Sequence, residues 1–230
     1  MTVAGRTDTG VHAWGQVCSY NGEPVGVGSL NALLPRDVAA LECSAAADGF
    51  DARRDATSRA YCYRVLARRG RSALEAGRVL HWPHALDLDL LDACAAALVG
   101  VHDFTAFTPT DTNHVRFSRE VYAAFWRRRG AAVREAGAAD ARAGARAAGS
   151  RGGAGAAESL EFWIEADAFM RNMNRVLVGT MLEVAGGRRS FGSFESLLRR
   201  APRADAGPTA PAHGLYLAGV GYGGQRVLEV

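Results

Sequence analysis

Ala4-Gly5-Arg6-Thr7-Asp8-Thr9-Gly10-Val11-His12-Ala13 is the stretch around which the rest of the chain is best understood. It places one carboxylate, Asp8, between an arginine two residues before it and a glycine two residues after it. Gly5 and Gly10 predict a tight, exposed loop, because glycine favours turns over helix or strand interiors. A short acid held beside a cation on such a loop is typical of a catalytic group, although a salt-bridged turn has the same pattern.

The triplet Asp8-Thr9-Gly10 by itself is also the triplet of aspartic proteases. That chemistry needs two such loops facing each other, so that two carboxylates share a proton. The sequence holds no second Asp-Thr-Gly, although a homodimer would supply one. Protease loops of this type follow an apolar strand, whereas Arg6-Thr7 is polar and charged. The residues before the aspartate therefore favour a different family.

The longer string from Gly5 to Ala13, followed by Gln16-Val17, resembles the signature of tRNA pseudouridine synthases of the TruA type. Segments 31–38, 100–107, 169–179 and 206–217 resemble further segments of the same family. The resemblance covers nearly all of the chain except 130–157. Relatives carry a strand and a helix before the loop, so we expect the first half of this chain to be truncated.

Composition sets broad limits on the class of protein. Hydrophobic residues make up 48% of the chain, which is ample for a buried core. All 27 basic residues are arginines, whose planar fork of donors suits phosphate, but the net charge of +3 is too small to establish a nucleic-acid partner. The cysteines, at 18, 43, 62 and 94, have no Cys-x-x-Cys spacing, so we expect neither a metal site nor a redox motif, and we expect an intracellular protein. No apolar run is long enough to cross a membrane.

Hydrophobic periodicity predicts strands over 14–20, 38–46, 58–66, 119–126 and 158–167, and helices over 26–34, 86–99, 169–185 and 193–201. The strands at 119–129 and 158–167 form a predicted hairpin, interrupted by 130–157. That insertion is almost entirely alanine, glycine and arginine, and we expect it to be disordered because it cannot build a core. In 100–107 we expect a capping Asp103 and buried phenylalanines at 104 and 107.

The predicted helix 169–185 carries the second group of chemical interest. Arg171 and Arg175 are spaced at i and i+4, so both would lie on one side of it. In the family pattern, Arg175 takes the place of the arginine that pairs with the catalytic aspartate. Asn172 stands where many relatives have histidine. The alternative interpretation of Arg175 is a surface arginine with a buried stem.

The resemblance implies an α+β fold of two ferredoxin-like halves with joined antiparallel sheets and a central cleft. We divide the chain into 1–85, the incomplete half with the catalytic loop, and 86–230. The implied activity is isomerisation of uridine to pseudouridine in the tRNA anticodon arm, without a cofactor, by a homodimer. Its catalytic residues would be Asp8, Arg175 and Tyr61, and its substrate-binding residues Arg6, Tyr61, Leu215 and His12.

Asp8 would act as the nucleophile at the nucleoside, or as the base in an elimination route. Arg175 would keep it ionised, and Tyr61 would stack on the target base and help to remove the C5 proton. An ordinary cross-strand aromatic is the alternative for Tyr61, and an ordinary strand residue is the alternative for Leu215. A catalytically silent RNA-binding fragment of such an enzyme is the alternative for the whole chain.

Overall fold

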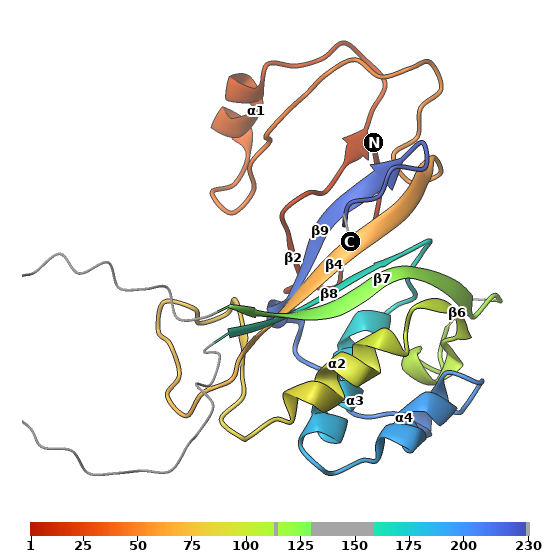
Figure 1. Ribbon diagram of the computed structural model, residues 1–230. Coiled ribbons are helices and arrows are strands. Elements are labelled where there is room, and N and C mark those ends of the chain that lie inside the picture. The colour runs from red at the N-terminus through yellow and green to blue at the C-terminus, as the bar shows by residue number, and fades with distance from the viewer. Residues whose placement is uncertain (113–114, 130–158, 229–230) are drawn as a thin grey trace, which may run out of the picture.

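The computed structural model describes residues 1–112, 115–129 and 159–228 (Figure 1). The predicted disordered insertion at 130–157 lies outside the described residues. The strands are β1 (Thr2–Val3), β2 (His12–Ala13), β3 (Cys18–Ser19), β4 (Ala56–Leu66), β5 (Leu80–His81), β6 (Gly100–Asp103), β7 (Ser118–Arg129), β8 (Ser159–Ala166) and β9 (Leu215–Tyr222). The helices are α1 (Val27–Leu33), α2 (Leu88–Ala96), α3 (Met173–Ala185) and α4 (Phe191–Leu197), with short 3-10 turns at Thr105–Phe107, Arg203–Asp205 and Ala212–Gly214.

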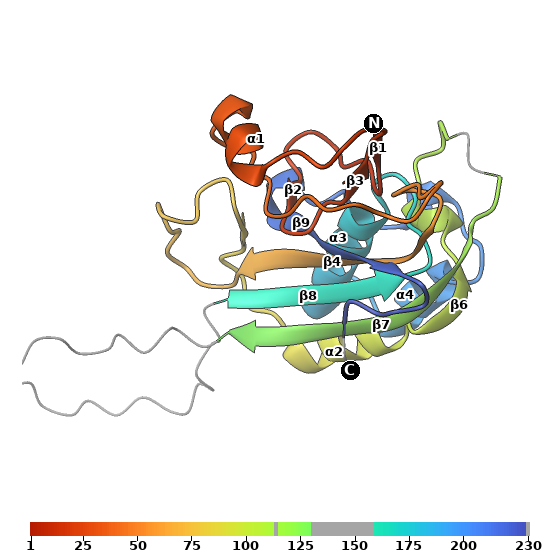
Figure 2. The same cartoon turned by 90° about the horizontal axis from the view of Figure 1, so that it is seen from above.

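Seven of the described strands form one sheet, in the order β2-β9-β4-β8-β7-β6, with β5 beside the end of β4. Neighbouring strands on that path are antiparallel except for β2, which runs parallel to β9. Helices α2, α3 and α4 cover one face of the sheet, while α1 lies apart with the N-terminal residues (Figures 1 and 2). The predicted α+β fold and the pairing of β7 with β8 are confirmed.

The central strand β4 joins the two predicted parts of the chain. It pairs with β8 on one side and with β9 on the other, and both of those strands come from beyond residue 86. The domain boundary at 85/86 stays a prediction. In the parts of the chain that the structure describes, no helix combines the length and apolar character needed to cross a bilayer.

The helix-covered face of the sheet holds the core, and its residues follow the predicted alternation. Tyr61, Tyr63 and Val65 of β4 are buried there, beside Phe162 and Ile164 of β8. In β7 the predicted alternation fails, because a bulge separates Val121 from Ala123. The extra residue shifts the register, so the core contains both Val121 and Ala124, which strict alternation along a strand would place on opposite faces.

Helix α2 shows how local sequence defines an element. Asp87 precedes its first turn, and its side chain accepts hydrogen bonds from the amides of Asp89 and Leu90. An N-terminal aspartate both satisfies free amides and complements the helix dipole. The buried face consists of Leu91, Cys94 and Ala95, as the spacing predicts.

Two of the predicted strands are wrong or shortened. Segment 38–46 contains no strand: Val38 is 51% exposed and Leu41 is 81% exposed. The amide side chain of Asn31 donates to the Ala40 carbonyl and accepts from the Ala40 amide, so it replaces the hydrogen bonds of a neighbouring strand. In the predicted strand 14–20, only the two residues of β3 are extended and paired.

The predicted helix 169–185 begins four residues late, at Met173. Asn172 precedes it with φ 61°, in the left-handed region that no α-helix can contain. Arg171 therefore lies outside the helix and pairs with Asp111, whereas Arg175 lies in its first turn. The prediction that the two arginines share one side of a helix is wrong.

Gly179 lets the loop at 207–210 lie directly against α3. A Cβ at this position would collide with the carbonyl oxygen of Pro208. We expect Gly179→Ala to destabilise the fold by about 1–3 kcal/mol, because backbone on both sides resists the extra methyl group. Chemical denaturation measures this loss. Gly192→Ala in α4 is the matched control, since a Cβ there meets nothing within 4 Å; equal stability of the two variants would contradict the prediction.

Candidate active site

The predicted loop around Asp8 is a turn held by its own backbone. The amide of Val11 donates to the carbonyl of Asp8 over 3.0 Å, and Gly10 between them has φ +84°. Such a turn needs glycine at this position, because a side chain there is strained. The Asp8 side chain remains 35% exposed at the surface of the turn.

Asp8 pairs with an arginine 167 residues further along the chain. Arg175 Nη1 donates to Asp8 Oδ2 over 2.9 Å, and the Arg175 side chain is 18% exposed. A charge-assisted hydrogen bond that is partly shielded from water fixes both groups more firmly than a surface ion pair does. The structure thus brings the two predicted groups together.

Three further contacts hold the Arg175 side chain and backbone. Nε donates to the Ala210 carbonyl over 2.7 Å, and Nη1 also donates to Asn172 Oδ1 over 2.9 Å. The Ala210 amide donates to the backbone carbonyl of Arg175 over 3.0 Å. Within the described residues, neither Arg175 Nη2 nor Asp8 Oδ1 has a protein partner. Both atoms are therefore available to a ligand.

Tyr61 lies on β4 beside this pair. Its ring is 8% exposed and meets the Phe169 ring edge to face, with 4.9 Å between the centroids. Burial, with a smaller contribution from the negative charge of Asp8, raises the pKa of Tyr61 to about 12, although Arg59 opposes the shift. Tyr61 is therefore a neutral phenol at physiological pH.

The first residues of the loop are anchored by Gln16, which belongs to the signature string. Its side-chain amide donates to the Gly5 carbonyl over 2.7 Å, and its oxygen accepts from the Gly5 amide over 3.3 Å. Gly5 lies close to the site, since a Cβ there would be 3.6 Å from the Tyr61 hydroxyl and 4.0 Å from Leu217. Leu217 was not predicted to be a residue of the site, although strand alternation places it on the same face as Leu215.

The other predicted substrate-binding residues lie in different surroundings. Arg6 is exposed and has no ion pair or hydrogen bond within the described part of the chain. The His12 ring is within hydrogen-bond distance of the Gly77 carbonyl, at 2.9 Å, and stacks on Tyr216. Leu215 is 7% exposed and faces Tyr63 across the strand pair. The structure thus brings Asp8, Arg175 and Tyr61 together. The contacts described here for His12 and Leu215 are with other residues, and Arg6 has none within the described part of the chain.

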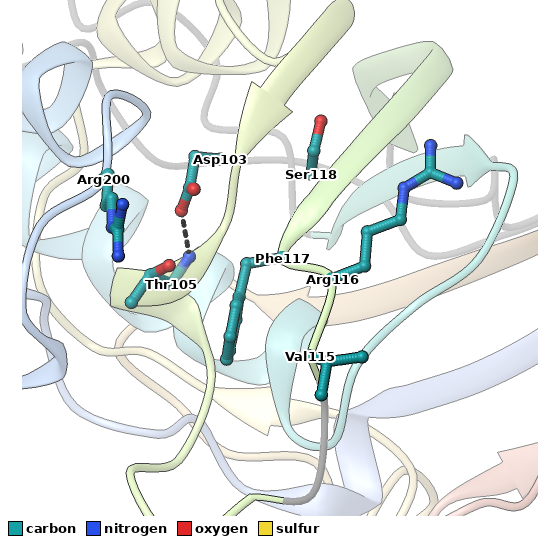
Figure 3. A pocket seen from close by; sticks show the side chains of 7 residues that line it. All are labelled: Asp103, Thr105, Val115, Arg116, Phe117, Ser118 and Arg200. Atoms are coloured by element: carbon teal, nitrogen blue, oxygen red, sulfur yellow. Dashed lines mark hydrogen bonds between the residues drawn. The ribbon is translucent and has the colours of Figure 1, made fainter.

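A separate surface hollow of about 420 Å³ contains none of the predicted site residues (Figure 3). In it, Asp103 accepts a hydrogen bond from the Thr105 amide. The cap position of the 3-10 turn at Thr105–Phe107 is occupied by Phe104, which forms no side-chain cap bond, so Asp103 lies one residue before the cap that was predicted for it. Its lining is formed by Asp103, Thr105, Val115, Arg116, Phe117, Ser118 and Arg200. Among the described residues, no three His, Cys, Asp or Glu side chains gather as metal ligands.

Comparison with known proteins defines the class. A family model described as tRNA pseudouridine synthase matches residues 94–223, which include α3 and Arg175. The chain belongs to this family of RNA-modifying isomerases. The pairing of Asp8 with a guanidinium, rather than with a second carboxylate, also differs from the arrangement that aspartic protease chemistry needs.

Individual relatives within this family share one name. A protein named tRNA pseudouridine synthase A from Caulobacter vibrioides is 35% identical, over 97% of this chain and 82% of the relative. Proteins of the same name from Myxococcus xanthus and Bacillus subtilis are 38% and 32% identical. Each match covers 95% of this chain, and they cover 75% and 80% of those relatives.

Proposed function

We propose that this chain isomerises uridine to pseudouridine in the anticodon arm of tRNA, with Asp8 as the nucleophile. The observation that carries the proposal is the Asp8–Arg175 pair, which leaves one carboxylate oxygen and one guanidinium nitrogen free for a substrate. Membership of the tRNA pseudouridine synthase family supports the substrate and the reaction. A homodimer, implied by the family resemblance, stays a prediction.

The reaction exchanges one glycosidic bond for another. Asp8 Oδ1 attacks C1′ of the ribose, and the bond from C1′ to N1 breaks, so uracil leaves as an anion. The base turns, its C5 attacks C1′ and displaces the carboxylate. Loss of the C5 proton and protonation of N1 then complete an isomer of the starting nucleotide. Arg175 holds the carboxylate in the orientation that both displacements need.

The remaining residues have roles in binding. The target nucleotide must leave its base stack, because Asp8 cannot reach its C1′ atom while the base is stacked in the RNA. The Tyr61 ring packs on the extruded base, and Leu215 lines the pocket. Arg6, which is exposed and unpaired within the described residues, contacts phosphate and positions the RNA. The substrate-binding role of His12 stays a prediction.

Tritium release tests the proposed reaction directly. A tRNA transcript labelled with tritium at C5 of uridine loses that tritium to water only when C5 forms the new bond. We expect release in stoichiometric amounts with the unchanged protein and none with Asp8→Asn. Binding of the transcript without any release by the unchanged protein would instead support the silent RNA-binding alternative.

Tyr61 gives a prediction about pH. A pKa of about 12 keeps the phenol protonated up to about pH 10. In the proposed mechanism, the Tyr61 hydroxyl gives its hydrogen to the displaced Asp8 carboxylate as it accepts the proton from C5. We expect Tyr61→Phe to lose about 10²-fold in kcat. The wild-type pH–rate profile should show no rise between about pH 7 and 10 from Tyr61 ionisation. A rising limb that disappears in Tyr61→Phe would show a phenolate base and contradict this assignment.

A further inference from the structure

The Arg59 side chain binds backbone carbonyls rather than a carboxylate. Nη2 donates to the carbonyls of Ala4 and Arg53, over 3.1 and 2.7 Å, and Nη1 donates to those of Ala56 and Asp167, over 3.1 and 3.2 Å. Among the described residues it forms no ion pair with an acid within 4.0 Å. The guanidinium therefore donates hydrogen bonds to the carbonyl oxygens of four different residues.

Two of those carbonyls belong to other segments that carry the proposed active site, while Arg53 and Ala56 lie shortly before Arg59, just before and at the start of β4. Ala4 lies four residues before Asp8, and Asp167 lies eight residues before Arg175. Arg59 itself is two residues before Tyr61, so both side chains project from the same face of β4. One side chain therefore connects the loop of Asp8, the strand of Tyr61 and the segment leading into α3.

The charge of Arg59 makes these bonds hard to exchange for water. The side chain is partly buried, and burial lowers the pKa of its guanidinium. A cation withdrawn from water must keep its hydrogen bonds or lose much of its solvation. The planar fork reaches two carbonyls with each terminal nitrogen, whereas a lysine ammonium has three donors at a single atom.

We propose that Arg59 is a positioning residue, which holds the loop of Asp8 and the segment leading to Arg175 in register with Tyr61. This inference rests on the proposed function, since it explains how three distant segments keep one geometry. A displacement of about 1 Å between reacting groups is enough to cost about 10²-fold in rate. The effect of losing Arg59 should therefore appear in the chemical step and not in the affinity for tRNA.

The test compares Arg59→Lys and Arg59→Met in the full chain, with tRNA transcript as substrate. We expect kcat to fall about 10- to 100-fold in both, with KM within about threefold of the wild type. Amide hydrogen exchange should become faster in residues 4–10, because the Ala4 carbonyl is no longer held. Arg119→Lys is the matched control, since Arg119 is also buried and donates to a carbonyl, but on β7; it should keep the wild-type kcat.

The outcomes separate this inference from the proposed function. If the wild type forms no pseudouridine, the proposed function fails, and hydrogen exchange in Arg59→Lys alone decides whether Arg59 holds the loop. Wild-type kcat and unchanged exchange in both variants would overturn the inference. So would a loss confined to KM, or a global unfolding of both variants, because Arg59 would then bind RNA or hold the fold as a whole.

Discussion

Asp8→Asn is expected to abolish pseudouridine formation while leaving tRNA binding close to that of the wild type. Asparagine keeps the size and the turn, but its amide cannot act as the nucleophile at C1′. Removing the nucleophile of an enzyme costs at least about 10³-fold in kcat, because no other group can form the covalent intermediate. Single-turnover formation of pseudouridine and filter binding of tRNA measure the two quantities separately.

A matched control exists because a second aspartate pairs with an arginine nearby. Asp111 pairs with Arg171, four residues before Arg175, but the Asp111 side chain is 81% exposed. Asp111→Asn should therefore retain wild-type activity. Comparable losses in Asp8→Asn and Asp111→Asn would mean that ion pairs around α3 support the structure, and that Asp8 has no chemical role.

Arg175→Gln is expected to show the second largest effect, a loss of about 10²- to 10³-fold in kcat. Glutamine removes the donor to Asp8 Oδ2 and the contacts to Ala210 and Asn172 at once. The carboxylate would then lose its fixed orientation and the charge that favours its anionic form. Steady-state kinetics with tRNA transcript measure the loss, which should fall mainly on kcat.

Arg171→Gln controls for the loss of a positive charge at this end of α3. Its removal should change kcat less than about threefold, because an exposed ion pair contributes little. Arg175→Lys adds a second comparison, since lysine keeps the charge but loses the fork that reaches Asp8 and Ala210 together. Wild-type kcat in Arg175→Gln would remove Arg175 from the mechanism.

The sequence could predict the parts of the fold that depend on the alternation of apolar and polar side chains or on a local capping residue. Leu160, Phe162 and Ile164 alternate in β8 and face the helices, as predicted. Asp87 likewise identifies the start of α2 within two residues of the predicted boundary. Both features depend on contacts between neighbours in sequence, which a local pattern records.

The failures arose where one residue changed the backbone. Asn172 in the left-handed conformation delays α3, and the bulge in β7 shifts its register. In segment 38–46, which forms no strand, the backbone of Ala40 bonds to the side chain of Asn31 instead of to a neighbouring strand. Hydrophobic periodicity does not show where a residue adopts a left-handed conformation, where a strand bulges or where a side chain bonds to the backbone.

The candidate site divides in the same way. Asp8 and Arg175 were predicted from a family pattern, since 167 residues separate them and no spacing rule connects them. Two of the backbone groups involved were missed, the carbonyl of Ala210 that accepts from Arg175 and the carbonyl of Ala4 that accepts from Arg59, because alanine has no polar side chain to point to them. Backbone acceptors become visible as part of a site only when the chain is folded.

Nucleotide-resolved mapping of pseudouridine in one tRNA transcript, treated with the wild type or with Asp8→Asn, tests the central claim most directly. We predict pseudouridine at positions of the anticodon arm after treatment with the wild type, and unmodified uridine at those positions after treatment with Asp8→Asn. The same modified positions with both proteins, or uridine left intact by a folded wild type that binds the transcript, would contradict the claim that Asp8, held by Arg175, carries out the isomerisation.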